Sequence, residues 1–253
     1  MKRIVVLSDI QAPLHDDRLV ASVTEFLVDY QPDVLLCVGD EADMTEISRW
    51  VKGGKEEFAG NLQAGLDQTH AIMAGFREAV GDVPFTVQRS NHTDRIANYV
   101  RRYAPALESL RGLSYESLLK YNDLGISVSS KPTPIAPGWL MMHGDEAGTN
   151  QSAGGTSLGL ARKTGQSVAC GHTHKLGLQH DHDSYAGRIT KRVWGMEVGH
   201  MMNLQRASYL KYGGSNWQAG FGLLHVFGTQ VYPQLVPAYS AGSFSVDGVL
   251  YGR

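Results

Sequence analysis

Five short clusters along the chain place carboxylate, imidazole or amide side chains directly after apolar runs. Nitrogen and oxygen donors of this kind suit borderline divalent ions such as Mn²⁺, Fe²⁺, Zn²⁺ or Co²⁺. Each cluster alone is typical of an ordinary turn or loop, but five of them in one chain predict a metal-dependent site. In chain order the clusters are Asp9-Ile10-Gln11, Gly39-Asp40, Asn91-His92, His143-Gly144 and Gly171-His172-Thr173-His174.

The clusters can meet in space only if the apolar runs before them are neighbouring strands. Residues 3–8 and 33–38 are rich in β-branched and apolar side chains, which is typical of buried strands. Residues 16–30 between them have apolar side chains at helical spacing and acidic residues placed to cap a helix. This order predicts a parallel, right-handed βαβ unit. Because ligands bind beyond the carboxyl ends of such strands, we expect the clusters to converge there.

The alternation of helix and strand continues through the N-terminal half. Residues 61–80 have a helical pattern, and residues 83–88 have the pattern of a strand. Residues 94–121 are helical in composition, with interruptions at Pro105 and Gly112.

Strands predominate in the C-terminal half. Residues 126–142 predict two short strands joined by a proline-rich turn, and residues 167–170 predict another strand. The Gly/Ser-rich residues 147–159 lead into a short helical segment, and strand and turn patterns alternate beyond residue 175. We therefore predict a single α/β domain over residues 1–253, with two packed mixed β-sheets and helices outside.

Composition narrows the class of function. The 253 residues include 23 basic and 25 acidic side chains, for a net charge of −2. This balance argues against a broadly basic nucleic-acid surface, although it allows a local phosphate-binding cleft. Cys37 and Cys170 lie in apolar runs and are expected to be buried free thiols. With no apolar stretch of membrane-spanning length, we expect a cytoplasmic protein with no membrane partner.

The order of the clusters resembles the calcineurin-like metallophosphoesterase family of binuclear metal phosphoesterases. The pattern of that family runs Asp-x-His, Gly-Asp, Gly-Asn-His-Asp/Glu, His and Gly-His-x-His. The resemblance covers residues 4–174, and the later stretches "GMEVGH" and "NWQAGFGLLHV" are similar to phage-encoded members. It implies a four-layer αββα sandwich with a two-metal site at the strand ends.

The resemblance also implies a role for each site residue. His92 would contact the substrate phosphate and protonate or stabilise the leaving oxygen. A shared anionic ligand would offset the repulsion between two cations, and a water bridging them would ionise near neutral pH to supply the nucleophile. The ligands would be Asp9 and His174 for the first ion, Asn91, His143 and His172 for the second, and Asp40 for both.

Three residues depart from the family pattern. Gln11 replaces a histidine, and its neutral amide is a poorer donor than imidazole, so we expect a weak, water-bridged or outer partner of the first ion. Ser90 replaces a glycine. The acidic residue that usually follows the catalytic histidine is displaced by one position to Asp94, which could still orient His92. Arg89 and Arg95 on the same loop are expected to be solvated or to form structural salt bridges rather than to contact phosphate.

Other polar and aromatic residues are interpreted conservatively. His180 and His182 are expected in a solvated hairpin turn, and His200 after Gly199 is a weaker candidate for the site. The stretch "NWQAGFG" is expected to be core and turn rather than a stacking platform.

The sequence thus favours a phosphodiesterase that hydrolyses small phosphodiesters, such as cyclic nucleotides or aryl diesters, by attack of a metal-bridging hydroxide. The expected cofactor is two divalent ions, Mn²⁺ first, with Fe²⁺, Zn²⁺, Co²⁺ or Ni²⁺ as alternatives. A phosphomonoesterase or protein phosphatase and a DNA or RNA nuclease stay open, although nothing in the composition builds a long basic groove. Gln11 favours a fourth alternative, a non-catalytic binding module.

Overall fold

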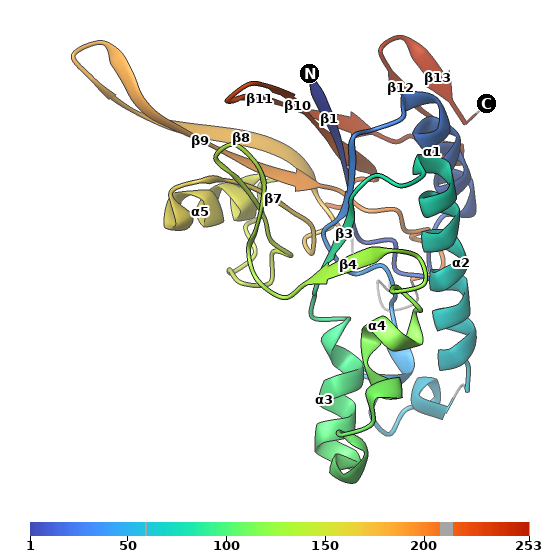
Figure 1. Cartoon of the computed structure of the whole chain (residues 1–253). Helices are drawn as coiled ribbons and strands as arrows, with labels where there is room; N and C mark the ends of the chain where they lie inside the picture. Colours follow the sequence, from blue (N-terminus) through green and yellow to red (C-terminus); the bar gives the residue numbers. More distant parts are fainter. Residues whose placement is uncertain (59, 208–214, 253) are drawn as a thin grey trace.

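The N-terminal apolar runs build the centre of a six-stranded mixed sheet. The computed structural model describes residues 1–58, 60–207 and 215–252 (Figure 1). The strands of this sheet in spatial order are β11 (Gln230–Pro237), β10 (Gly220–Phe227), β1 (Lys2–Leu7), β2 (Val34–Cys37), β3 (Phe85–Gln88) and β4 (Ile126–Ser129). Strands β1 to β4 are parallel, whereas β10 is antiparallel to β1 and β11 is antiparallel to β10.

A second mixed sheet of five strands contains the later polar clusters. Its strands in spatial order are β5 (Thr133–Ala136), β6 (Trp139–Met141), β7 (Ser167–Cys170), β9 (Arg188–Val198) and β8 (Leu176–Tyr185). Strands β6, β7 and β9 are parallel, and β5 and β8 are antiparallel edges. A separate small hairpin consists of β12 (Phe244–Val246) and β13 (Val249–Tyr251).

Helices cover the outer face of each sheet and form a lobe beside them. The α-helices are α1 (Asp17–Tyr30), α2 (Leu62–Val80), α3 (Asp94–Tyr103), α4 (Tyr115–Leu118) and α5 (Gly155–Thr164). Short 3₁₀ turns are η1 (Thr45–Ile47), η2 (Lys55–Phe58), η3 (Pro105–Leu107), η4 (Arg111–Leu113) and η6 (Ser240–Gly242). Helices α3 and α4 project from the sheets as a separate lobe (Figure 1). Among the described residues, no helix has both the length and the apolar character needed to cross a bilayer.

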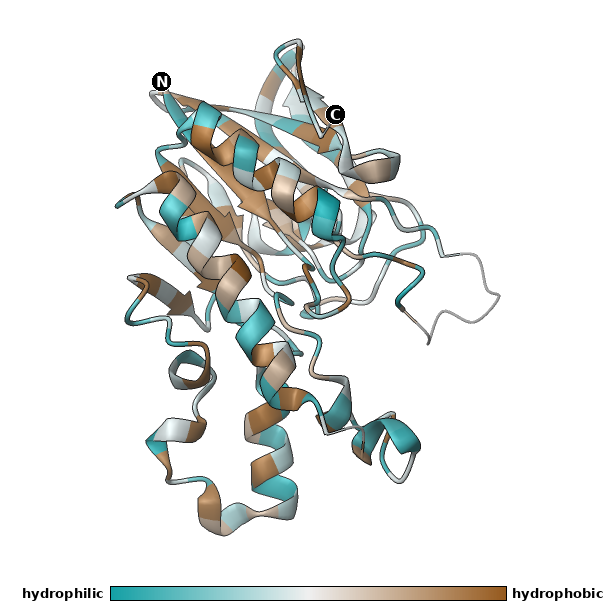
Figure 2. Cartoon of the chain, turned by 90° about the vertical axis from the view of Figure 1, so that its right-hand side faces the viewer, coloured by the Kyte–Doolittle hydropathy of each residue, from teal (hydrophilic) through white to brown (hydrophobic). Residues whose placement is uncertain are grey.

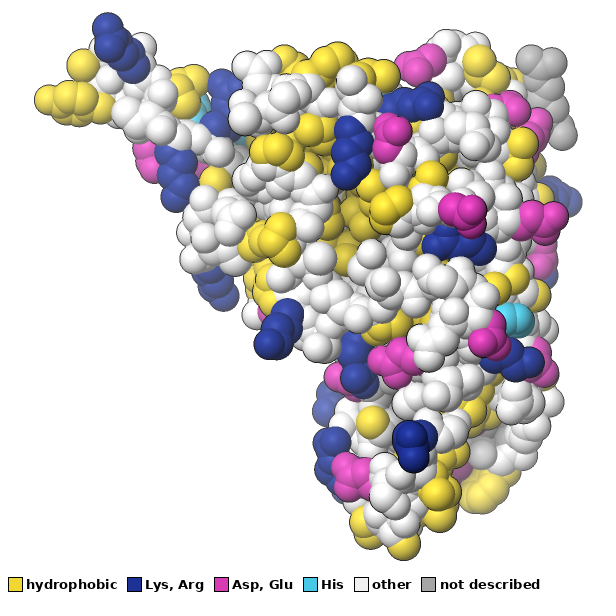
Figure 3. All heavy atoms as spheres, viewed as in Figure 1, with side chains coloured by type: hydrophobic (Ala, Val, Ile, Leu, Met, Phe, Trp, Pro, Cys, Tyr) yellow, Lys and Arg dark blue, Asp and Glu magenta, His cyan; other side chains and the backbone are white. Residues whose placement is uncertain are grey.

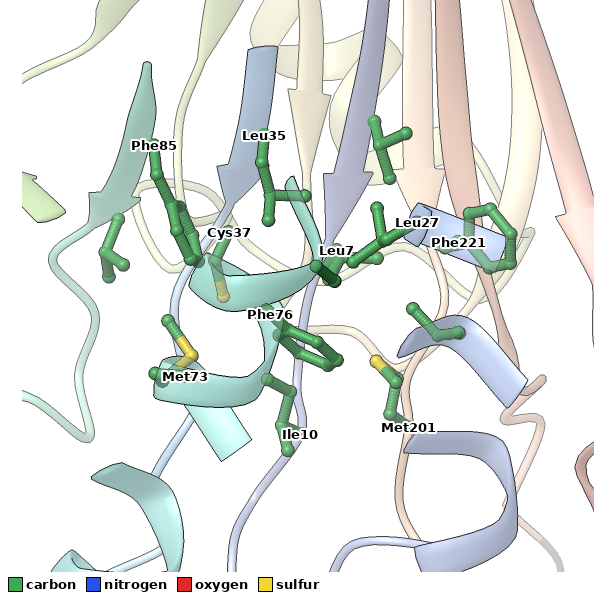
Figure 4. Close-up of a cluster of buried hydrophobic side chains, with 14 of the residues drawn as sticks. Leu7, Ile10, Leu27, Leu35, Cys37, Met73, Phe76, Phe85, Met201 and Phe221 are labelled. Carbon is green, nitrogen blue, oxygen red and sulfur yellow. The ribbon is translucent and has the colours of Figure 1, made fainter. Parts of the chain in front are cut away.

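Side-chain alternation along β1 explains the layering. Val5 and Leu7 point into the core beneath α1 and α2, while Ile4 and Val6 point into the core between the two sheets. Figure 2 shows α1 and α2 lying across apolar strands, and Figure 4 shows Leu7 and Leu35 in the same buried cluster as Phe76 of α2. A third core lies between the second sheet and α5. The order of layers is therefore helix, sheet, sheet, helix, which confirms the αββα sandwich.

Helix α1 shows how local sequence fixes one of these layers. Asp16 caps the helix, because its side chain accepts hydrogen bonds from the backbone N–H groups of Arg18 and Leu19 at 3.0 and 3.2 Å. Such a cap stabilises a helix by about 1 kcal/mol. Phe26 is fully buried and contributes about 2–3 kcal/mol by leaving water. The helix ends at Tyr30 because Gln31 adopts a left-handed conformation before Pro32.

The predicted elements are largely present, with one correction in the middle of the chain. Residues 126–142 contain three strands rather than two, because β4 completes the first sheet before β5 and β6 begin the second. Pro134 lies within β5, where it is tolerated because this strand is an edge.

A second correction concerns the hairpin formed by β8 and β9. His180 and His182 lie within β8, and the turn that joins the strands is at Ala186 and Gly187, both with positive φ. The end of this hairpin extends away from the sandwich (Figure 1). The two histidines are exposed as expected, but in a strand rather than in a turn.

Candidate metal centre

The strand ends of both sheets deliver their polar clusters to one place. Asp9 follows β1, Asp40 follows β2, His143 follows β6, and His172 and His174 follow β7. Three of these side chains, Asp9, Asp40 and His174, place donor atoms within 4.8 Å of one another. Asp40, His143 and His172 form a second group within the same limit. Asp40 therefore belongs to two adjoining groups of metal-capable atoms.

Direct contacts hold the ends of the two sheets together at this point. The backbone N–H of His172, in the second sheet, donates to Asp9 Oδ2 at 2.9 Å, and the same oxygen accepts from the Ser8 hydroxyl. His143 Nδ1 lies 2.7 Å from the Val38 carbonyl oxygen, which directs the other ring nitrogen toward Asp40 Oδ2 at 3.4 Å. An outer hydrogen bond of this kind fixes the orientation of a metal-binding imidazole.

The backbone at the site is strained. Asp9, Gln11, Asp40, His172 and His174 have φ values of 50°, 55°, 56°, 65° and 57°, in the left-handed region that side chains with a Cβ rarely adopt. Each such residue costs about 1–3 kcal/mol unless its surroundings enforce it, and such strain gathers at functional sites. The strand ends are therefore bent to aim side chains at a common point.

Two glycines make the close approach possible. A Cβ on Gly171 would lie 1.8 Å from Ser8 Oγ and 2.4 Å from Asp9 Oδ2, so any side chain there would collide with the first cluster. Gly39 has a φ of 103°, and a Cβ there would lie 2.8 Å from His143 Nδ1. The glycines that open the Gly-Asp and Gly-His-Thr-His clusters are thus needed for the two sheets to meet.

Charge interactions shift the protonation of the buried groups. Burial opposes ionisation of Asp40, but His143 and His92 beside it hold the pKa of this carboxyl well below its usual range. The pKa of Asp9 is also lowered, since His174 outweighs the effect of burial. Burial disfavours the charged form of His143, yet the charges of Asp40 and Asp9 raise its pKa to about 10. In the metal-free protein Asp9 and Asp40 are therefore ionised, and their charges keep His143 protonated near neutral pH.

Buried oxygen atoms without hydrogen-bond donors indicate whether cations fit the candidate metal centre. Among the described residues, Asp40 Oδ1 and Gln11 Oε1 are buried and have no hydrogen-bond donor. His174 Nε2 lies 2.9 Å from Asp9 Oδ1. Buried carboxylate oxygens without donors are costly unless a cation binds them. The donor set and its unsatisfied atoms therefore fit divalent metal ions.

Gln11 contacts the shared carboxylate rather than standing apart from the site. Its Nε2 donates to Asp40 Oδ2 at 3.2 Å, and its Oε1 is one of the unsatisfied oxygens. Ser90, the other replacement in the pattern, accepts hydrogen bonds from the backbone N–H groups of Asp40 and Thr93, both at 3.2 Å. Both replacements are thus built into the site.

His92 lies beside the metal-capable atoms, and Asp94 does not. His92 Nε2 is 3.8 Å from Asp40 Oδ2 and 2.8 Å from an Arg95 guanidinium nitrogen. Asp94 pairs with Arg89 at 2.6 Å, so the expectation that it orients His92 is not met. Helix α3 begins at Asp94, and the carboxylate nearest to His92 Nδ1 is that of Asp43, at 3.9 Å.

Arg95 and Trp217 are contributors that sequence reasoning missed. Arg95 was expected to be solvated or in a structural salt bridge, but its guanidinium contacts His92 and donates to the Asp43 carbonyl oxygen. Trp217, expected in core and turn, packs on His174 with ring centroids 4.1 Å apart. Both line a cavity of about 420 Å³ that also contains Gln11, Asp40, Asn91, His92, His172 and His174. The "NWQAGFG" stretch could have indicated a role for Trp217 at the site, because it places an indole among small and polar residues.

His143 contacts Asn91 of this cavity, and His200 is buried next to His174. His143 Nε2 is 3.0 Å from Asn91 Oδ1. His200 is buried against His174, with ring centroids 5.7 Å apart, and its Nδ1 accepts the Met202 N–H at 3.0 Å. Burial and the neighbouring His174 lower the pKa of His200 to about 3, so it is a neutral wall of the site.

Comparisons with solved structures show the fold alone. Vps29 from Chaetomium thermophilum has a TM-score of 0.50 at 11% identity, covering 100% of this chain and 99% of that chain. Vps29 from Cryptosporidium parvum has a TM-score of 0.49 at 14% identity, covering 100% and 98%. The first likeness agrees with the calcineurin-like metallophosphoesterase fold predicted from the sequence.

Sequence comparisons find phage proteins. No protein-family model matches the sequence. The Gene 54 protein of Mycobacterium phage D29 is 40% identical over 250 residues, covering 98% of this chain and 97% of the relative. The Gene 54 protein of Mycobacterium phage L5 is 39% identical with the same coverage. Identity at this level over nearly the whole length shows that the chain belongs to the family of the mycobacteriophage Gene 54 proteins.

Proposed function

We propose that this protein is a metal-dependent phosphoesterase and, more specifically, a phosphodiesterase. The observation that carries the proposal is Asp40, a buried carboxylate common to both groups of metal-capable atoms. Two cations close together repel each other, so a two-metal site needs a shared anionic ligand. A site of this kind at the strand ends of an αββα sandwich suits phosphoryl transfer, which depends mainly on positioning and charge stabilisation.

The proposed ligands divide between two ions. When bound, two divalent ions supply Lewis-acid activation of water and neutralise charge on the phosphoryl group. We expect Mn²⁺ to serve, because the donors are a mixture of carboxylate, imidazole and amide. The proposed ligands are Asp9, Asp40 and His174 for the first ion, with Gln11 as a weak partner, and Asp40, Asn91, His143 and His172 for the second.

His92 and Arg95 are proposed to act on the substrate. His92 lies in the cavity wall next to Asp40, where it can contact the phosphoryl group and deliver a proton to the leaving oxygen. Burial, with a further contribution from the Arg95 charge, lowers the pKa of His92 in the metal-free protein. Arg95 also presents a positive charge to the cavity, which favours an anionic ester.

The shape of the cavity favours a diester over a monoester. A diester has a substituent on each side of the phosphorus atom, and so it needs space in two directions. The cavity shares Asn91 and Arg95 with a neighbouring hollow, and its lining also includes Trp217, which packs on His174. A closed pocket for a terminal phosphate would not need either extension.

The test is a pair of aryl substrates with purified protein and Mn²⁺. We expect bis-aryl phosphate to be hydrolysed faster than mono-aryl phosphate, and His92→Ala to lower the diester rate by about 10²–10⁴-fold. His182→Ala is the matched control, because that histidine is exposed on the β8–β9 hairpin. The reverse substrate ratio would indicate a phosphomonoesterase, and a protein inert with every metal would indicate a binding module.

A further inference from the structure

The cavity of about 420 Å³ at the candidate metal centre, here called the metal cavity, opens into a second hollow beside α3. This hollow, here called the α3 pocket, has a volume of about 360 Å³ and lies between the segment 47–52 and helix α3. It shares Ser48, Trp50, Asn91 and Arg95 with the metal cavity. A substrate whose phosphate lies at the metal site would therefore extend past Asn91 and Arg95 into the α3 pocket.

The α3 pocket concentrates positive charge. Arg49, Lys52, Arg95 and Arg102 line it, and its described lining includes no acidic side chain. Glu57 at the edge pairs with Lys52 at 2.5 Å, which leaves the three arginines as the main source of positive charge. Figure 3 shows both cationic and acidic side chains over the projecting lobe of α3 and α4, so the excess of positive charge belongs to the pocket lining alone. In a chain with net charge −2, this local excess favours a ligand with a further anionic group.

Aromatic rings in the same pocket are exposed and paired with cations. Trp50 is 79% exposed and Tyr103 is 44% exposed. The Arg49 guanidinium lies 4.5 Å from the Trp50 ring centroid, and Lys52 Nζ lies 4.0 Å from that of Tyr103. Tyr99 packs on Tyr103 at 4.8 Å between centroids. These rings offer faces on which a planar ligand can stack.

The α3 pocket combines aromatic rings, cationic side chains and amides. Together these groups suit a ligand with planar bases and a phosphate backbone. Proteins hold single-stranded nucleic acid by stacking its bases on aromatic side chains and by tracking its phosphates with Lys and Arg. Asn98 in α3 adds an amide to the pocket wall. A base inside a duplex is covered by its neighbours and cannot offer its faces in this way.

We propose that the α3 pocket binds the nucleotide next to the scissile phosphate of a single-stranded nucleic acid. The proposal rests on the phosphodiesterase function proposed above, and it names the substrate class of that site. The base stacks on Trp50 or Tyr103, and the next phosphate contacts Arg49 or Arg102. Sequence composition disfavoured nucleic acid because the net charge predicts no long basic groove, but the structure gathers Arg49, Arg95 and Arg102 at one pocket.

The experiment measures fluorescence anisotropy of labelled dT8, rU8 and a 16-base-pair DNA duplex with the chelator-treated full chain. Chelation allows binding to be measured without hydrolysis. We expect dT8 or rU8 to bind more tightly than the duplex. Trp50→Ala and Tyr103→Ala should each raise the Kd by about tenfold. Arg102→Ala should reduce the slope of log Kd against log salt by about 0.7.

Matched controls come from the β8–β9 hairpin, where Tyr185 is 81% exposed and Arg192 is also exposed. Tyr185→Ala and Arg192→Ala should leave both quantities unchanged, and unfolding midpoints confirm that every variant folds. A duplex that binds as tightly as the single strands, or pocket variants that match the controls, would overturn the proposal. Hydrolysis of bis-aryl phosphate with Mn²⁺ is measured separately, so pocket-dependent binding without any hydrolysis would overturn the proposed function instead.

Discussion

At the scale of single residues, the main departure from the expected site is Gln11. Its amide nitrogen donates to Asp40, the residue common to both metal-capable groups, while its amide oxygen is buried without a donor. A neutral amide oxygen binds borderline divalent ions less well than imidazole does. Gln11 therefore keeps the architecture of the site, but it should weaken the binding of the ion held by Asp9, Asp40 and His174.

Replacing Gln11 tests this directly. Gln11→His should lower the Kd of the weaker Mn²⁺ ion by about tenfold, because an imidazole adds a stronger ligand. Calorimetric titration of the chelated protein measures the change, and Gln11→Ala serves as the matched loss of the amide. If all three proteins bind Mn²⁺ with the same affinity, Gln11 has no part in holding the ion.

At the scale of elements, one buried carboxylate links three segments around the site. Glu197 of β9 is fully buried, and its Oε1 accepts from the backbone N–H groups of Thr156 and Ser157 at 2.8 and 3.3 Å. Its Oε2 accepts from the Thr173 hydroxyl at 3.0 Å, and Thr173 lies between His172 and His174. Glu197 thus ties the first turn of α5 to the loop that carries two proposed ligands.

Glu197→Ala should lower the free energy of unfolding by about 3 kcal/mol, because buried donors lose a charged acceptor. It should also weaken Mn²⁺ binding, since the loop with His172 and His174 loses its support. Urea unfolding and metal titration measure the two effects, with Glu25→Ala on the exposed side of α1 as the control. A loss of stability no larger than that of the control would contradict the linking role.

The elements themselves were largely predictable, and the contacts between them were not. Apolar runs that end in polar residues identify strand ends, so the convergence of Asp9 and Asp40 follows from the parallel pairing of β1 and β2. His174 belongs to the second sheet, and it reaches them through the packing of the two sheets. The contact between Arg95 and His92 depends on the point at which α3 begins, and that of Trp217 with His174 depends on how a distant loop packs. Asp94 pairs with Arg89 rather than with His92, which also depends on where α3 begins. Sequence spacing does not fix such tertiary contacts.

At the scale of the whole molecule, a buried acid next to the site makes the stability of the fold depend on pH. Glu41 follows Asp40 and is fully buried beneath the first sheet, where Tyr121 donates to its Oε1 at 2.7 Å. Burial raises the pKa of Glu41 to about 7. The folded protein therefore holds a proton that the unfolded chain releases above pH 4.5.

The sign of the resulting pH dependence follows from this raised pKa. Between pH 4.5 and about 7 the folded state binds more protons than the unfolded state, so stability falls as the pH rises through this window. The loss amounts to roughly 3 kcal/mol at most. Unfolding of chelated wild type and Glu41→Gln at pH 5 and pH 8 measures it, because the variant cannot titrate. An equal pH dependence in both proteins would show that Glu41 is not the cause.

The account as a whole depends on two ions sharing Asp40 where the two sheets meet. The most direct test titrates chelated protein with Mn²⁺ while recording both the ions bound per chain and the rate of bis-aryl phosphate hydrolysis. The account predicts two ions per chain, with hydrolysis that rises as the weaker ion binds, and loss of both binding and rate in Asp40→Asn. Full hydrolysis in the absence of Mn²⁺, or no bound ion at saturating Mn²⁺, would contradict it.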